Sequence, residues 1–124
     1  MTRLQQLYDE QHQSPWIDNL RRDDTRSGVL ADQVASGIRG ITSNPSIFQK
    51  AIEGTDAYDA QFGELIAGGR TITDAYWDLV VTDITEALDV LAPLHEASGG
   101  EDGFVSIEVA PDIAHDTGRS IEAA

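Results

Sequence analysis

Residues 37–48 read Gly37-Ile-Arg-Gly-Ile-Thr-Ser-Asn-Pro-Ser-Ile-Phe48 and join the end of one structural element to the start of another. Ile38 to Thr42 is a short apolar run of the kind that forms a buried β-strand. Asn44-Pro45 then opens a helix, because asparagine is a favoured N-cap and proline fits the first helical position. A polar amide therefore stands where a buried strand gives way to a helix.

Two other segments share this design. Pro15-Trp-Ile-Asp-Asn19 places Asp18 at the end of a first short strand, and Gly103-Phe-Val-Ser-Ile-Glu-Val109 places Glu108 at the end of a third. If the three strands are parallel, their carboxyl ends meet at one edge of the sheet, and the polar side chains come together there. Active sites of βα barrels are built in this way.

The segments outside these strands have helical periodicity. The pattern predicts a short helix before Ser14-Pro15, ahead of the first strand, and a helix capped by Asp23 or Asp24 between the first two strands. Three helices are expected between Asn44 and the third strand. A further helix is predicted to start near His115-Asp116-Thr117.

Strands that alternate with helices predict an α/β fold with a parallel sheet and right-handed crossovers. Three strands alone leave both sheet edges unpaired and cannot have both faces covered efficiently. The final residues, 118–124, have the pattern of a helix start without a stop signal. We therefore expect residues 1–124 to be the first three βα units of a TIM (β/α)8 barrel, a truncated N-terminal part of a single domain that needs about 250 residues.

The charge and composition narrow the function classes. The 22 acidic and 8 basic side chains give a net charge of −14, which repels nucleic-acid backbones and anionic lipids, and offers little to hold a phosphorylated ligand. No cysteine is present, so a disulfide framework or thiolate metal site is excluded. The sequence contains neither a signal-peptide pattern nor the roughly 20 apolar residues that span a bilayer. We expect a cytoplasmic protein; the oligomeric state is not predicted.

Strand alternation predicts which side chains share a face. Ser106 and Glu108 should look into the barrel near its top, as should Thr42 with Asn44, and Asp18 on the first strand. Such interiors are normally filled by branched apolar residues, so polar groups there are costly unless they serve a ligand.

Each of these polar groups also has a purely structural interpretation. Asn44 is equally well explained as a helix cap, and Asp18 as a cap of backbone amides in its own turn. Glu108 is harder to explain without a ligand, because a carboxylate flanked by isoleucine and valine in a buried strand needs a partner.

The remaining titratable side chains do not form a recognisable site. His12, His95 and His115 lack metal-ligand spacing, so we expect surface histidines and no metal. Lys50, the only lysine, falls on a helix and is predicted to be a solvated surface charge. Two carboxylates and an amide suit proton transfer and hydroxyl recognition, whereas carbon–carbon bond chemistry would also need a Schiff-base amine.

At these residues the chain resembles transaldolase, in the form of the longer bacterial enzymes. The likeness covers essentially all 124 residues, and three ordered blocks carry it: Ser14-Pro-Trp-Ile-Asp-Asn-Leu-Arg-Arg-Asp23, the stretch from Gly37 to Ile52, and Asp102-Gly-Phe-Val-Ser-Ile-Glu-Val-Ala-Pro111.

The resemblance implies a Schiff-base enzyme of the pentose phosphate pathway that uses no cofactor. It would move a dihydroxyacetone unit from sedoheptulose 7-phosphate to glyceraldehyde 3-phosphate, giving erythrose 4-phosphate and fructose 6-phosphate. Asp18 matches the acid/base carboxylate, and Glu108 the carboxylate that works through a water. Asn44 matches the amide that binds substrate hydroxyls, and Thr42 and Ser106 are candidate lining residues.

One element of the family's chemistry is missing. The Schiff-base lysine of transaldolases lies at the end of the next barrel strand, and this role is not transferred to Lys50. We therefore expect no turnover from this chain alone. Two alternatives are another lysine-dependent aldolase on the same barrel, and a non-catalytic truncated chain that acts as an interaction module.

Overall fold

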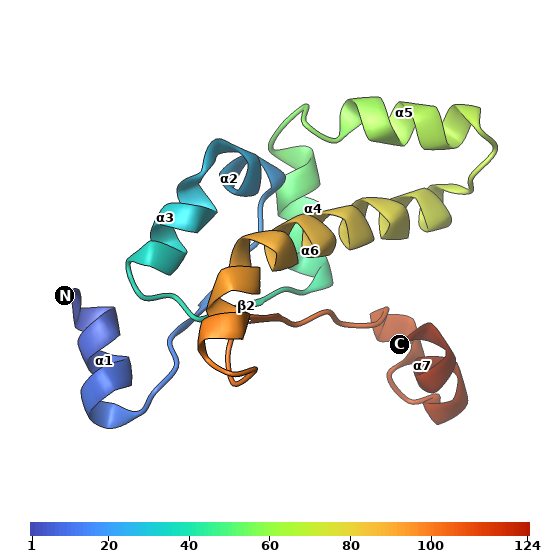
Figure 1. The fold of residues 1–124 in the computed structure, drawn as a ribbon. Coiled ribbons are helices and arrows are strands. Elements are labelled where there is room, and N and C mark those ends of the chain that lie inside the picture. Colours follow the sequence, from blue (N-terminus) through green and yellow to red (C-terminus); the bar gives the residue numbers. More distant parts are fainter.

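The computed structural model describes all residues from 1 to 124. Three short strands alternate with helices along the chain (Figure 1). The elements are α1 (Arg3–Gln11), β1 (Trp16–Asp18), α2 (Arg22–Ser27), α3 (Val29–Ala35), β2 (Gly40–Thr42), α4 (Pro45–Glu53), α5 (Asp59–Ala67), α6 (Ile72–Ala97), β3 (Phe104–Val105), the 3-10 turn η1 (Pro111–Ile113) and α7 (Thr117–Ala123). None of the helices combines the length and apolar character needed to cross a membrane.

The strands form one sheet in the order β1-β2-β3, and both pairings are parallel. The predicted α/β fold with a parallel sheet is therefore confirmed. In register, Ile17 lies beside Ile41, and Ile41 beside Val105. Membership of a closed barrel stays a prediction.

The third strand is much shorter than the predicted span of 103–109. After Phe104–Val105, one more ladder bond forms, from the Ser106 N–H to the Ile41 carbonyl at 2.9 Å. Beyond that point the third strand has no neighbouring strand to pair with, because β2 has ended and α4 begins at Pro45. The chain then runs away from the sheet towards α7, which Figure 1 shows set apart from the other helices.

One face of the sheet is covered by helices. Ile41 is fully buried, and Ile17 and Val105 pack beside it. These three side chains, one from each strand, are the part of the sheet that contacts the helices. The main core cluster contains Leu20, Leu30, Ile41, Phe48, Val80, Ile84, Ala87 and Leu91. Most of these come from α3, α4 and the inner face of α6, which closes over the sheet.

The opposite face of the sheet is open. Trp16 and Phe104 flank Gly40 in register and are 39% and 44% exposed. A Cβ on Gly40 would lie 2.2 Å from Cε2 of Trp16, so the indole lies directly over this glycine. Asp18 and Thr42 belong to the same face one step further along, as the predicted alternation requires.

The helices agree with the sequence pattern except between β1 and β2, where the start of the predicted helix differs and the helix is divided in two. The predicted cap at Asp23 or Asp24 is wrong: α2 begins at Arg22, and both aspartates lie in its first turn, where negative charge favours the helix dipole. Gly28 then adopts φ 93°, a left-handed conformation that separates α2 from α3. The predicted start near residue 116 is confirmed, because the Asp116 side chain accepts from the Arg119 N–H and caps α7.

Candidate functional site

Asp18 and Thr42 meet at the carboxyl ends of β1 and β2. They are partners in the strand register, and the Thr42 hydroxyl donates to Oδ1 of Asp18 at 2.7 Å. Asp18 is exposed and its second oxygen has no partner within the chain. One carboxylate oxygen is therefore held by the neighbouring strand, while the other faces solvent and can accept a ligand hydroxyl.

Two serines join the ends of β2 and β3. The Ser43 hydroxyl donates to the Ser106 carbonyl at 2.6 Å, and the Ser43 N–H reaches the Ser106 hydroxyl at 3.4 Å. Ser43 is only 1% exposed. Ser106, a predicted lining residue, thus also holds the strand ends together. Sequence reasoning missed Ser43, which directly follows β2 and lies on the same side of the chain as Ile41, away from the face that carries Thr42.

Asn44 caps α4. Its Oδ1 accepts from the Ile47 N–H at 2.9 Å, so the structural interpretation of this residue as an N-cap is confirmed. The side-chain NH2 makes no hydrogen bond within the chain, and the residue is partly exposed. Capping therefore uses the amide oxygen and leaves the amide donor for a ligand.

Glu108 lies beyond the end of β3 and is exposed, so its predicted position in a buried strand is wrong. It lines an open depression of about 520 Å³ with Pro45, Val109 and Pro111 among its neighbours. Asp18 lines a different depression, of about 430 Å³, beside Ile47 of the same helix. Pro45, at the start of α4, borders the first depression and Ile47 the second, so within this chain the two carboxylates face separate hollows.

A buried ionic network lies behind the Asp18 loop. Arg22 Nε donates to Oδ1 of Asp83 at 2.6 Å, and the Tyr58 hydroxyl donates to Oδ2 at 2.5 Å. The Arg22 guanidinium also lies 4.2 Å from the Tyr58 ring centroid. Burial raises the pKa of Asp83, although its hydrogen bonds from Tyr58 and Arg22 oppose the shift. Burial, followed by the bond to Asp83, raises the pKa of Tyr58.

This network fixes the course of the chain after β1. The Arg22 N–H is bonded to the Tyr58 hydroxyl at 3.3 Å, and its guanidinium contacts carbonyls in α6 and before α5. Only three residues separate Arg22 from Asp18. Sequence reasoning missed the network; its one signal was a carboxylate, Asp83, on the otherwise apolar face of the long helix.

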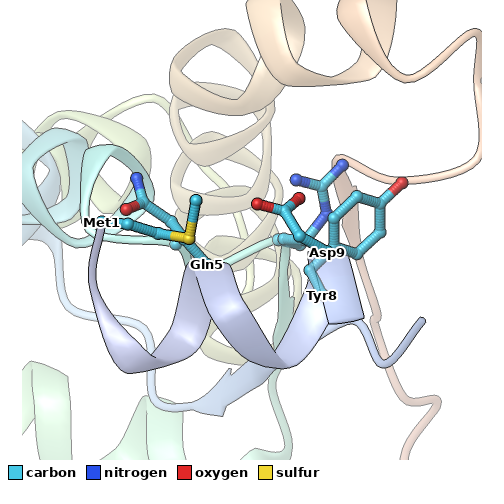
Figure 2. A pocket seen from close by; sticks show the side chains of 6 residues that line it. Met1, Gln5, Tyr8 and Asp9 are labelled. Atoms are coloured by element: carbon cyan, nitrogen blue, oxygen red, sulfur yellow. The ribbon is translucent and has the colours of Figure 1, made fainter. Parts of the chain in front are cut away.

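A further hollow, of about 350 Å³, lies at the opposite edge of the sheet. Figure 2 shows Met1, Gln5, Tyr8 and Asp9 of the N-terminal segment around it. The Arg39 guanidinium at its border is already engaged, because it stacks 3.5 Å from the Tyr8 ring centroid and donates to Asp102 at 2.6 Å. This edge of the sheet carries none of the predicted site residues.

Comparison with known proteins gives a consistent result. Residues 15–124 match the family model described as Transaldolase/Fructose-6-phosphate aldolase. "Transaldolase 2" of Nostoc punctiforme is 52% identical over 113 residues, which are 90% of this chain and 30% of that protein. "Transaldolase" of Trichodesmium erythraeum is 46% identical over 90% of this chain and 30% of its own length. "Transaldolase 1" of Streptomyces avermitilis is 43% identical over 98% of this chain and 32% of its own length. The chain therefore spans just under a third of the length of these relatives.

Proposed function

Because the chain belongs to the transaldolase/fructose-6-phosphate aldolase family, we propose that residues 1–124 supply the first three βα units and part of the active site of a transaldolase barrel. The complete barrel would transfer a dihydroxyacetone unit from sedoheptulose 7-phosphate to glyceraldehyde 3-phosphate in the pentose phosphate pathway. The observation that carries this proposal is the Asp18 carboxylate, held by Thr42 at the carboxyl edge of a parallel sheet. Ligands of barrel enzymes bind at that edge.

Each site residue has a proposed role that its surroundings support. Asp18 takes the hydroxyl proton when the carbon–carbon bond breaks, and the hydrogen bond from Thr42 fixes the orientation of the Asp18 carboxylate. The free amide donor of Asn44 binds a substrate hydroxyl while its oxygen caps α4. Glu108 acts through a water during Schiff-base formation and hydrolysis, which its solvent-exposed position allows. Ser106 lines the site beside the β2–β3 junction.

The reaction needs a lysine that this chain does not supply at a strand end. Lys50 lies in the last turn of α4, is exposed and makes no ion pair, in agreement with the predicted surface charge. We propose that residues 1–124 alone do not turn over substrate. The test is borohydride reduction in the presence of fructose 6-phosphate, followed by mass spectrometry. No adduct is expected, and a stable adduct at Lys50 would show that the proposal is wrong.

Complementation tests the catalytic assignment directly. The chain would be mixed with a separately produced C-terminal piece of the Nostoc punctiforme relative, and transfer would be followed as erythrose 4-phosphate formation. The transaldolase assignment is supported if transfer is restored, if Asp18→Asn abolishes the restored transfer, and if Lys50→Ala leaves it intact. Release of free dihydroxyacetone without transfer would instead indicate a lysine-dependent aldolase.

The open face of the sheet favours a second candidate function. Trp16 and Phe104 are 39% and 44% exposed, and both edge strands carry unpaired backbone groups, which suits association with another chain. Binding of the C-terminal piece without any activity, for the wild-type chain, would favour a non-catalytic interaction module over the enzyme.

A further inference from the structure

The pairing of β2 with β3 changes its character at Ser43. Up to that point the ladder is regular, and its last backbone bond runs from the Ser106 N–H to the Ile41 carbonyl at 2.9 Å. If a parallel ladder continued by the same step, the next bonds would join the Ser43 N–H to the Ser106 carbonyl and the Glu108 N–H to the Ser43 carbonyl. Neither of these two backbone bonds forms.

Two hydroxyl groups take the place of the missing ladder bond. The Ser43 hydroxyl donates to the Ser106 carbonyl at 2.6 Å, and the Ser43 N–H donates to the Ser106 hydroxyl at 3.4 Å. The two backbones are therefore linked here through side-chain oxygens instead of directly. Ser43 is only 1% exposed, so water cannot readily replace its hydroxyl.

The segment that carries Glu108 has no other anchor nearby. Residues 107–109 make no backbone hydrogen bond, and the next one downstream joins the Ile113 N–H to the Ala110 carbonyl at 3.3 Å. Ser106 is therefore the last fixed residue before Glu108, which follows it by two positions. The direction in which Glu108 leaves the sheet depends on how Ser106 is held.

Ser43 acts on this segment from outside the ligand-facing surface. It lies on the same side of the chain as Ile41, away from the face that carries Thr42. Pro45 follows Ser43 by two residues and borders the same depression as Glu108. The bond from Ser43 thus joins the two chain segments that lead to this depression, without the serine itself contacting a ligand there.

We propose that Ser43 is a positioning residue for Glu108. Its hydroxyl holds the Ser106 carbonyl, and in this way fixes the path of residues 107–109 and the place of the Glu108 carboxylate. An acid or base works only within hydrogen-bond reach of the group that it serves, so a displacement of about 1 Å slows its step. The catalytic part of this inference rests on the proposed function, in which Glu108 serves Schiff-base formation and hydrolysis.

The first measurement uses residues 1–124 alone and follows amide hydrogen exchange by NMR. Ser43→Ala should raise the exchange rate of the Ser106 amide about tenfold, the effect of losing one buried hydrogen bond. Amides in the middle of α6 should keep their wild-type rates. Unchanged exchange at Ser106, or an equal rise in α6, would overturn the proposal.

Two further substitutions at Ser43 grade the effect. Ser43→Thr keeps the hydroxyl and should keep the slow exchange of Ser106. Ser43→Cys introduces a weaker donor and should give an intermediate rate, and it replaces Ser43→Ala in the comparison if that variant does not fold. Fast exchange in Ser43→Thr at wild-type stability would show that the hydroxyl does not hold the segment.

The second measurement uses the chain complemented with the C-terminal piece of the Nostoc punctiforme relative. Fructose 6-phosphate is added, and borohydride quenching at successive times gives the rate and the final amount of Schiff-base adduct. Ser43→Ala should slow adduct formation about tenfold, with the final amount and the KM for fructose 6-phosphate unchanged. A role limited to folding or assembly would lower the final amount and leave the rate unchanged, and this result would overturn the proposal.

The adjacent residue provides a matched variant. Thr42→Val removes the hydrogen bond to Asp18, so it should slow transfer to glyceraldehyde 3-phosphate while the adduct forms at the wild-type rate. Equal slowing of adduct formation in Thr42→Val and Ser43→Ala would overturn the specific link between Ser43 and Glu108. If the wild-type mixture forms no adduct, the proposed function fails, and the exchange rate of Ser106 alone decides whether Ser43 holds this segment.

Discussion

Asp83→Ala should be among the most destabilising single substitutions in this chain. The substitution removes the acceptor for both Arg22 Nε, at 2.6 Å, and the Tyr58 hydroxyl, at 2.5 Å. The Arg22 and Asp83 side chains are 1% and 0% exposed, so water cannot replace the lost carboxylate. Of its hydrogen bonds, the guanidinium would keep only the long ones to the carbonyls of Leu79 and Ala57, at 3.3 and 3.5 Å, beside its contact with the Tyr58 ring.

The size of the effect follows from that geometry. Removing one partner of a buried ion pair costs about 3–5 kcal/mol, because the other charge stays buried without compensation. Small domains have about 5–15 kcal/mol of stability in total, so the loss is a large fraction of it. With a urea dependence of roughly 2 kcal/mol per molar, the unfolding midpoint should fall by about 2 M.

The matched control is Asp78→Ala in the same helix. Asp78 pairs with Arg70 at 2.7 Å, but these side chains are 34% and 47% exposed, so the loss should stay below about 1 kcal/mol. Both variants gain the same helix propensity, and urea unfolding followed by circular dichroism compares them directly. Equal losses in the two variants, or a loss below 1 kcal/mol for Asp83→Ala, would refute the reasoning about burial.

Three further predictions concern single contacts. Gly40→Ala should destabilise the chain by about 1–3 kcal/mol and shift its tryptophan fluorescence, because the new methyl would displace the Trp16 ring. Gly63→Ala in α5 should instead stabilise the chain by about 0.5–1 kcal/mol in urea unfolding, because a Cβ at Gly63 meets open space. The hydrogen bond and charge of Arg26 lower the pKa of Glu86 below its ordinary 4.5. Its stabilisation should therefore be present above pH 4.5 and disappear as the pH falls through the lowered value, so wild-type and Glu86→Gln unfolding midpoints should converge in acid. A gap that persists at pH 2 would contradict this assignment.

The alkaline limit of stability should depend on Tyr58. Its pKa is raised above the ordinary 10.0 in the folded chain, chiefly by burial and then by the bond to Asp83. A raised pKa stabilises the fold below pH 10, and this contribution is lost as the pH climbs towards the folded-state value. Tyr58→Phe should be less stable at pH 7 and lose less between pH 10 and 12, as measured by thermal unfolding. If the wild-type chain and Tyr58→Phe lose the same stability between pH 10 and 12, the ionisation of Tyr58 does not set the alkaline limit.

Local patterns were sufficient to predict the order in which strands and helices alternate, although the single helix expected between β1 and β2 is divided into α2 and α3. Asn44-Pro45 opens α4 because the cap and the proline act within a single turn, and that prediction needed no knowledge of the rest of the chain. The parallel sheet followed from alternating strands and helices, and the positions of Asp18 and Thr42 on one face followed from strand periodicity. These features depend on residues close together in the sequence.

Features that depend on distant partners could not be predicted in this way. The third strand stops at Val105 because its neighbour β2 has ended, a fact about pairing that no pattern within residues 103–109 contains. Asp83 is buried only because Arg22 arrives from 61 positions earlier in the chain. Likewise, Asp18 and Glu108 face different hollows, and residues of α4 border both of them. Packing of separate segments sets the surroundings of each charge, and those surroundings decide its chemistry.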